Sequence, residues 1–375
     1  MKVQGILVGL TLAALGLAGC GGGGSSGGGG SAPLPVPPTP GEQWTLAQAA
    51  DVGMDANLLA RAVSELPPAS THGLASMLVL RHGKPVVEQY WNGYDKDTAH
   101  DLRSATKSIT SLLVGIALDA QVLSSVSTPI ASYLNADYPN TPALKQGITI
   151  EHLLTMSSGL ACDDWDALSP GNEQKMYQQT DWVQFILNLP STASPGAVTQ
   201  YCTGGPVTLG HILANATKQP VPTFANTQLF GPLGIASTSL QWADYKNHAQ
   251  TDTGGHIRMR PRDMSKIGQL VLQGGKWNGV RVVSNAWITA ATTHRRDFTQ
   301  VGNRGGYGYL WWLSKESYKS STVDVIRADG NGGQYIFVIP ALDMVAVFTG
   351  ENYDSGKAYL PFSLLTTYVL PAVLQ

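Results

Sequence analysis

The sequence has little charge and only three cysteines, and each shortage narrows the classes of protein to consider. Charged residues make up 13% of the 375 residues, which is low for a coiled coil or a disordered chain. Lys and Arg number 24 against 26 Asp and Glu, so we expect no nucleic-acid partner, which would require a basic surface. Hydrophobic residues, at 43%, are numerous enough for one large domain or two smaller ones with a sizeable core.

Several catalytic and cofactor motifs are also missing. Past the low-complexity residues 21–41, no Gly-x-Ser-x-Gly occurs, which disfavours the α/β-hydrolase arrangement. No His-Glu-x-x-His occurs, and the eight His are scattered without the spacing of metal ligands. The Gly-rich residues 21–41 have neither a strand before them nor a helix after them, unlike a phosphate-binding loop. We therefore expect no metal and no other cofactor.

The N-terminal residues have the pattern of an export signal followed by a tether. Lys2 precedes an apolar run, residues 6–17, that is too short for a permanent membrane-spanning helix. The run ends in Leu-Ala-Gly-Cys20, which resembles a bacterial lipobox and implies that Cys20 is lipidated; the alternative is an ordinary signal peptide cleaved nearby. We expect a signal peptide at 1–19 and a Gly/Ser/Pro-rich linker at 20–43. This predicts an exported lipoprotein on a membrane, facing the periplasm or the cell exterior.

Two cysteines remain once Cys20 is set aside. They are Cys162 and Cys202, and an oxidising compartment favours a disulfide between them. The sequence therefore predicts a Cys162–Cys202 bridge.

From residue 44 onward the patterns indicate one α/β domain that ends at residue 375. Residues 74–81 and 85–91 are rich in Val, Leu and aromatics and flank a Gly-containing turn, as in a β-hairpin. Apolar residues then fall at helical spacing from near Ser104, and helical patterns dominate to about residue 230. Three strand-like runs follow, at 307–313, 335–339 and 344–349, and a helical run covers 360–374. We expect a helical lobe, roughly 104–240, inserted in the α/β part.

Ser104 and Lys107 form the strongest candidate for catalysis. Three residues along a helix bring two side chains to one face, so Lys107 can contact the Ser104 hydroxyl. A serine becomes a good nucleophile only when a neighbour takes its proton, and a helix start favours negative charge. This is the only Ser-x-x-Lys in the chain, and it opens a strongly apolar helix. The alternative is a structural Ser cap followed by a solvated Lys.

Two later segments carry further candidates. Tyr201-Cys-Thr203 precedes Gly-Gly-Pro, which predicts a tyrosine on a turn before a helix near Leu209. Gly330-Asn-Gly-Gly-Gln334 precedes the strand-like run at 335–339, and glycines at a strand start let a substrate approach the backbone.

With these elements in this order, residues 44–375 resemble the serine β-lactamase and penicillin-binding-protein superfamily, in its class C and esterase branch. Ser104-Ala-Thr-Lys107 matches the family's Ser-x-x-Lys, Tyr201-Cys-Thr203 its Tyr-x-Asn, and Ala328-Asp-Gly330 its Lys-Thr-Gly-type strand. The stretch Leu153-Leu-Thr-Met-Ser-Ser-Gly-Leu160 is also similar to one in this branch. The resemblance implies a β-lactamase/DD-peptidase-like fold, an antiparallel sheet flanked by helices.

The resemblance also implies a role for each site residue. Ser104 would form an acyl-enzyme, and Lys107 would lower the pKa of Tyr201, which acts as general base. The backbone N–H groups of Ser104 and Asn331 would form the oxyanion hole. The remaining candidates for substrate binding are Thr203, Gly330, Gly332, Gly333, Trp165 and His256. Trp165 belongs to an acidic, aromatic loop, residues 161–172, which has two interpretations: a pocket wall or a solvated surface loop.

Two departures from the family pattern bear on the substrate. Thr203 replaces an Asn and lacks the two-ended grip of an amide. Asp329 stands where the family has a cation or hydroxyl that holds an anionic substrate. An aspartate there would repel such a substrate, unless Arg327 compensates for its charge. Because Gly330–Gln334 is more similar to esterases and 6-aminohexanoate-oligomer hydrolases, we expect a small ester or amide substrate with a neutral or basic group. The alternatives are a β-lactamase or DD-peptidase, and a non-catalytic lipid-anchored binding protein; the patterns indicate no oligomeric state.

Overall fold

A computed structural model describes residues 44–140, 145, 147–243 and 250–374, all within one compact unit, Val36–Gln375. The signal peptide, Cys20 and the linker predicted for residues 1–43 lie outside the described residues. No helix within these ranges has the length and apolarity needed to cross a membrane.

The described residues form a large antiparallel sheet of eight strands in the order β2-β1-β12-β11-β10-β9-β8-β7. These strands are β1 (Leu74–Arg81), β2 (Lys84–Tyr90), β7 (Arg296–Asp297), β8 (Gly306–Tyr307), β9 (Trp312–Tyr318), β10 (Ser321–Gly330), β11 (Gln334–Ile339) and β12 (Met344–Gly350). Two small pairs accompany it, β3 (His100–Asp101) with β4 (Arg258–Met259), and β5 (Lys276–Trp277) with β6 (Val280–Arg281). The predicted hairpin of β1 and β2 is confirmed.

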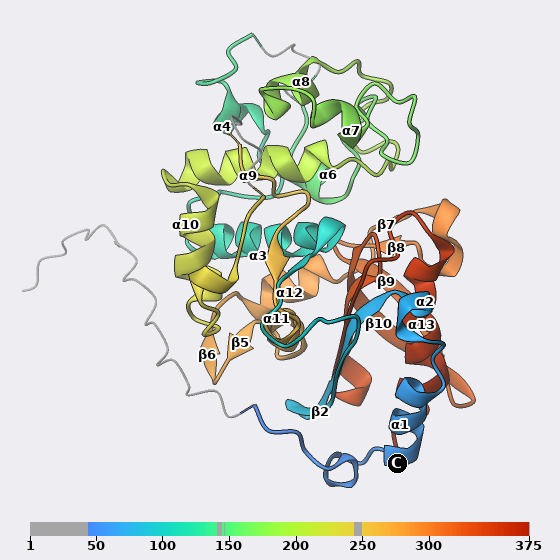
Figure 1. Ribbon diagram of the computed structural model, residues 1–375. Coiled ribbons are helices and arrows are strands. Elements are labelled where there is room, and N and C mark those ends of the chain that lie inside the picture. The colour runs from blue at the N-terminus through green and yellow to red at the C-terminus, as the bar shows by residue number, and fades with distance from the viewer. Residues whose placement is uncertain (1–43, 141–144, 146, 244–249, 375) are drawn as a thin grey trace, which may run out of the picture. The chain divides into compact units, whose positions relative to one another are not determined.

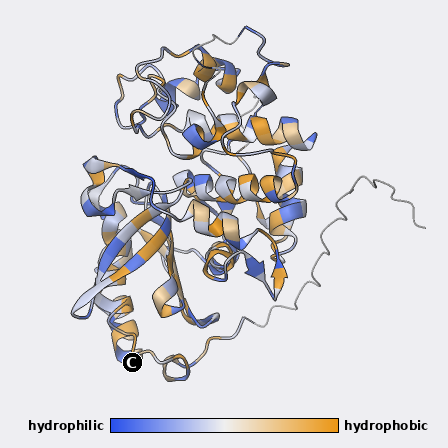
Figure 2. Ribbon diagram, turned by 180° about the vertical axis from the view of Figure 1, so that it is seen from behind, coloured by the Kyte–Doolittle hydropathy of each residue, from blue (hydrophilic) through white to orange (hydrophobic). Residues whose placement is uncertain are grey.

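The central strands are almost continuously apolar because both faces of the sheet are covered. Along β1, Leu78 and Leu80 belong to one hydrophobic core, whereas Met77 and Val79 belong to the other. Figure 1 shows α1 (Ala56–Ser64) and α13 (Leu360–Leu364) on one face, with α11 (Pro261–Leu272) and α12 (Asn285–Ala291) on the opposite side. Figure 2 shows hydrophobic residues in both the helices and the strands, because helices and strands contribute together to each of the two cores.

A helical lobe lies between β3 and β4 in the chain, as predicted. Its helices are α3 (Thr106–Asp119), α4 (Ala131–Leu134), α6 (Ile150–Leu154), α7 (Glu173–Met176), α8 (Trp182–Asn188), α9 (Gly204–Thr217) and α10 (Val221–Ala225). The short α2 (Ala69–His72) precedes β1. Helix α3 is buried along most of its length and lies beside α9 in Figure 1. The expected β-lactamase/DD-peptidase-like arrangement, an antiparallel sheet flanked by helices with a helical insertion, is confirmed.

One local expectation was wrong, and the structure refines two others. Residues 307–313 are not one strand, because Leu310 has a φ of 60° and the chain turns between β8 and β9. The helix expected near Leu209 is α9, which already begins at Gly204, because the first helical turn needs no N–H partners and therefore accommodates Pro206. The last helix also departs from α-helical geometry, since a π-helical segment, Leu365–Val369, follows α13.

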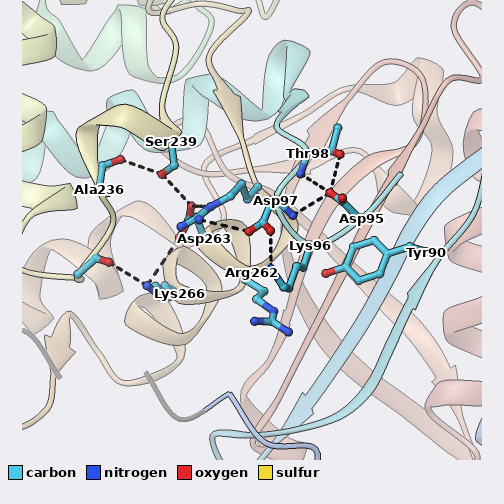
Figure 3. Close-up of polar contacts among 12 residues, drawn as sticks. Tyr90, Asp95, Lys96, Asp97, Thr98, Ala236, Ser239, Arg262, Asp263 and Lys266 are labelled. Atoms are coloured by element: carbon cyan, nitrogen blue, oxygen red, sulfur yellow. Dashed lines mark hydrogen bonds and ion pairs between the residues drawn. The ribbon is translucent and has the colours of Figure 1, made fainter. Parts of the chain in front are cut away.

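A network of ion pairs joins α11 to neighbouring loops (Figure 3). Asp263 on α11 is fully buried and contacts Arg260 Nε at 2.8 Å, Lys266 Nζ at 3.6 Å and Ser239 Oγ at 3.2 Å. Each anionic oxygen of Asp263 therefore has a cationic neighbour. We call this set of contacts the α11 network.

Candidate active site

Ser104 lies on a tight turn between β3 and α3. The turn is a short 3₁₀ helix, Arg103–Ala105, and its first residue has the unusual φ of 48°. The Asp101 carboxylate accepts a hydrogen bond from the Arg103 backbone N–H at 2.9 Å and so supports this conformation. Positive φ at a non-glycine residue is strained and is retained where the surrounding structure enforces it. The turn places Ser104 at the wall of a pocket.

Lys107 contacts Ser104 as the Ser-x-x-Lys spacing predicts. Its Nζ lies 3.0 Å from Ser104 Oγ and 2.6 Å from the carbonyl oxygen of Gly254. The side chain is 1% exposed, so its ammonium group has almost no access to water. The carbonyl of Gly254 therefore holds Nζ in place against the serine.

Tyr201 reaches the same serine from the loop before α9. Its phenol lies near the Ser104 hydroxyl, which acts to lower the phenol pKa, and the centre of its ring lies 5.0 Å from Lys107 Nζ. Two segments that are far apart in the sequence thus bring a hydroxyl and an amine together with a phenol. This is the geometry that nucleophilic catalysis by serine requires.

Burial dominates the protonation of the two partners. It lowers the pKa of Lys107, although the nearby carboxylates Glu173, Asp164 and Asp252 act in the opposite direction. Burial raises the pKa of Tyr201 well above its usual value, and the neighbouring Tyr307, Asp329 and Asp164 act in the same direction. The Ser104 hydroxyl acts in the opposite direction and lowers this pKa. The structure therefore gives a raised pKa for Tyr201 where a lowering by Lys107 was expected, because desolvation of the phenolate is the largest effect.

The pocket beside Ser104 has a volume of about 470 Å³. Its wall includes Trp165, whose ring stacks on Tyr201 with centres 5.2 Å apart and planes at 4°. The Trp312 ring lies 5.7 Å from the Tyr201 ring and 6.4 Å from the Trp165 ring, so the three rings form one cluster. Of the two interpretations of loop 161–172, the structure supports the pocket wall for Trp165.

The Cys162–Cys202 disulfide is present and explains how the wall is attached. Cys162 precedes Asp164 and Trp165 by a few residues, and Cys202 follows Tyr201 directly. The backbone N–H of Asp164 also donates to the carbonyl oxygen of Tyr201 at 2.8 Å. The predicted bridge therefore ties the aromatic loop to the segment that carries the tyrosine.

Two carboxylates lie near Lys107: Asp252 is fully buried, and Asp164 is partly buried at the pocket wall. Asp164 accepts backbone hydrogen bonds from Thr203 at 2.6 Å and Glu173 at 2.9 Å, and Asp252 accepts from Gly254 at 3.0 Å. Burial raises the pKa of Asp164 to about 6 and that of Asp252 to about 6. Both therefore carry most of their charge at neutral pH, but at an energetic cost.

The end of β10 approaches the Ser104 turn closely. A Cβ atom on Gly330 would lie 2.2 Å from the carbonyl oxygen of Leu102, so only glycine permits this contact. Asn331 follows at the pocket wall, and its side-chain amide donates to Asp354 at 2.8 Å. Asp329 also lines the pocket, while Arg327, 1% exposed, lies 3.4 Å from its carboxylate. Arg327 thus pairs with Asp329 and does not line the pocket in its place.

Four predicted substrate contacts lie away from the pocket wall. Thr203 is fully buried, and its hydroxyl donates to Glu173 at 2.9 Å. His256 contacts Asp101 at 2.7 Å. Gly332 and Gly333 form the turn between β10 and β11 with φ values of 93° and 97°. The Thr203 hydroxyl is therefore already engaged by Glu173 and does not face the pocket wall.

Several wall residues were not among the predicted site residues. Glu173, Asp354, Tyr335 and Tyr359 line the pocket but come from segments that carry no catalytic motif. The acidic composition of loop 161–172 did indicate Asp164, whereas a turn such as the one at Asp354 carries no signal in a single sequence.

Comparisons with known proteins identify the family and support the fold. The model of the Beta-lactamase family matches residues 39–356. The 6-aminohexanoate-dimer hydrolase of Paenarthrobacter ureafaciens is 23% identical over 295 residues, which cover 72% of this chain and 71% of that protein. A putative β-lactamase from Bacteroides dorei DSM 17855 has a similar structure, with a TM-score of 0.67 at 15% identity over 84% of this chain and 99% of that one. So does EstCE1, a hydrolase with promiscuous acyltransferase activity, with a TM-score of 0.64 at 15% identity over 84% and 98%.

Proposed function

The chain belongs to the Beta-lactamase family, and we propose that it is a serine hydrolase that cleaves an ester or amide bond of a small substrate. One observation carries the proposal: Ser104 Oγ lies 3.0 Å from Lys107 Nζ at the wall of a pocket that Tyr201 also lines. A buried structural serine would have no need of two titratable partners and an open face.

The reaction begins with proton transfer from the Ser104 hydroxyl to the neutral amine of Lys107. Ser104 Oγ then attacks the substrate carbonyl carbon, and the bond to the leaving group breaks. The Tyr201 phenol protonates that group, and the proton held on Lys107 restores the phenol. Water repeats these steps on the acyl-enzyme and releases the acid. The lowered pKa of Lys107 and the raised pKa of Tyr201 support this division of roles.

The oxyanion hole in this proposal consists of the backbone N–H groups of Ser104 and Asn331. Support comes from the close contact of Gly330 with Leu102, which places the end of β10 against the Ser104 turn. Each such donor typically contributes about 3 kcal/mol to transition-state stabilisation.

The substrate is proposed to be an ester or amide and not a β-lactam. In this pocket Asp329 occupies the place where the family pattern has a group that holds the carboxylate of the drug. One relative is a 6-aminohexanoate-dimer hydrolase, and one structural neighbour is a hydrolase with acyltransferase activity. Both activities proceed by transfer of an acyl group, which is the chemistry that Ser104 would perform.

The experiment compares p-nitrophenyl butyrate with nitrocefin on purified protein, with Ser104→Ala as control. We expect ester cleavage that the variant loses, and little nitrocefin turnover. Comparable nitrocefin turnover, or acylation by a labelled penicillin, would favour a β-lactamase or DD-peptidase. Ester cleavage that survives in Ser104→Ala would favour a non-catalytic binding protein with a contaminating activity.

We also propose that the chain is an exported lipoprotein held on a membrane through Cys20. The support is the lipobox-like Leu-Ala-Gly-Cys20 and the Gly/Ser/Pro-rich linker after it. In a bacterial host, the full chain should sediment with membranes, whereas Cys20→Ser should not be lipidated. Equal distribution of both proteins in the soluble fraction would contradict the anchor.

A further inference from the structure

The wall of the Ser104 pocket is strongly acidic. Four carboxylates line it: Asp164, Glu173, Asp329 and Asp354. Among the described residues that line the pocket, none is Lys, Arg or His. The wall therefore differs from the chain as a whole, in which 24 basic residues nearly balance 26 acidic ones.

Two basic groups behind the wall, Lys107 and Arg327, are buried and already have partners. Lys107 donates to Ser104 and Gly254, and Arg327 donates to Asp329 and to the Arg304 carbonyl oxygen. Both side chains are 1% exposed, so neither can contact a substrate anion directly.

Among the described residues, three of the four carboxylates form no ion pair with a basic side chain of the kind that Asp329 forms with Arg327. Asp164 is held by backbone N–H groups, Glu173 by the Thr203 hydroxyl and Asp354 by the Asn331 amide. These donors are neutral, so much of the negative charge remains, although Lys107 lies close enough to Asp164 and Glu173 to offset part of it. The field in the pocket consequently favours a positive charge.

Aromatic rings complete the wall. Trp165 is 46% exposed, and with Trp312 and Tyr201 it forms a stack whose members lie 5.2 to 6.4 Å apart. Tyr335 and Tyr359 line the same pocket. Ring faces next to carboxylates attract organic cations, because the ring quadrupole and the negative charges act in the same direction.

We propose that the pocket selects substrates that carry an ammonium group, placed between the carboxylates and the ring faces of the wall while Ser104 attacks the ester or amide carbonyl. This inference rests on the proposed hydrolase function and specifies its substrate class. An organic cation fits better than a metal ion, because no group of three or more acidic, His or Cys side chains among the described residues is placed to hold a metal.

The test compares substrates that differ only in charge. The first pair is the p-nitrophenyl ester of γ-trimethylammoniobutyrate and its carbon isostere, in which a tert-butyl group replaces trimethylammonium. The second pair, butyrylcholine and its carbon isostere, places the same groups on the alcohol side. In at least one pair the cation should raise kcat/KM about tenfold or more. The p-nitrophenyl monoester of succinic acid should be the poorest p-nitrophenyl substrate.

Two variants locate the effect. Asp354→Asn keeps the size of the side chain and a carbonyl oxygen for Asn331, so the fold should be retained. It should reduce the ratio of cationic to neutral kcat/KM several-fold, and Asp329→Asn should do the same. Asp324→Asn is the matched control, because Asp324 pairs with Lys315 at an exposed site outside this pocket, and it should leave the ratio unchanged.

The outcomes separate this inference from the hydrolase function. Cleavage of the neutral esters that Ser104→Ala abolishes, with no cation advantage in either pair, would overturn the substrate class and leave the hydrolase proposal standing. No cleavage of any ester would count against the hydrolase proposal itself. A cation advantage that persists in both Asp354→Asn and Asp329→Asn would also overturn the inference.

Discussion

The α11 network and the pocket around Ser104 both bury carboxylates beside a lysine, but only the network neutralises each acid directly. Asp263 has Arg260 at 2.8 Å and Lys266 at 3.6 Å. Near Ser104, Asp252 and Asp164 accept hydrogen bonds mainly from neutral backbone N–H groups. Lys107, the basic side chain between them, donates to Ser104 and Gly254 and not to either acid.

The contrast shows where the chain tolerates an energetic cost. Burial raises the pKa of Asp252 to about 6, some two units above its value in an unfolded chain. At 1.36 kcal/mol per unit, keeping Asp252 charged at neutral pH costs up to about 3 kcal/mol. A network built for stability would pair such a group, whereas a site that moves protons requires groups whose charge can change.

Removing the nucleophile should give the largest change of all. We expect Ser104→Ala to lower kcat/KM for p-nitrophenyl butyrate by at least about 10⁴-fold, because no other group can form the acyl-enzyme. Thermal unfolding should be nearly unchanged. Ser111→Ala, a buried serine on the same helix, is the control and should retain activity. Similar losses in both variants would indicate damage to α3 and not loss of the nucleophile.

Removing the acid at the centre of the α11 network should instead damage stability. We expect Asp263→Ala to lower the free energy of unfolding by about 3–5 kcal/mol, because it leaves Arg260 and Lys266 without their buried partner. Chemical denaturation measures this. Asp324→Ala removes one member of an exposed pair and should change stability by less than about 1 kcal/mol. Equal effects would mean that the network is no more than a surface ion pair.

The local part of the site was predictable from the sequence. Ser104 and Lys107 lie one helical turn apart, so their contact follows from spacing alone, and the disulfide followed from having only two cysteines in the domain. Tyr201 was found through the order of the motifs. The raised pKa of its phenol was not predictable, because burial depends on which segments cover the ring, and a sequence does not state that.

The fold was also predictable where it depends on local sequence patterns, and the predictions failed where it depends on contacts between distant segments. The apolar runs of β1, β11 and β12 are continuous and bounded by turn residues, so they identify strands. Strand β10 carries Arg327 and Asp329, which form an ion pair with each other. These charged residues interrupt the apolar pattern, so the pattern of apolar runs did not identify this strand. The contacts of Thr203 with Glu173 and of His256 with Asp101 likewise join distant segments.

Neutralising Asp252 should remove the free energy cost of keeping this buried carboxylate charged. The folded-state pKa of about 6 lies above the unfolded value, so the favourable contribution of this group is complete below about pH 4 and is lost as pH rises through 6. Asp252→Asn removes that loss. The free energy of unfolding of the variant relative to wild type should therefore increase by up to about 3 kcal/mol between pH 4 and pH 8. Denaturation curves at both pH values measure this difference, and a difference that does not change with pH would contradict the assignment.

The same substitution gives the smallest and most specific test, since Asp252 raises the pKa of Lys107 while burial lowers it. If the neutral amine of Lys107 accepts the serine proton, kcat/KM falls as acid protonates that amine. Removing the negative charge of Asp252 should lower the Lys107 pKa further and move this acid limb to lower pH. Asp324→Asn should leave the limb in place, because that residue lies at an exposed ion pair. If the limb does not move in Asp252→Asn, the group that titrates is not Lys107, and the proton of Ser104 must pass to another base.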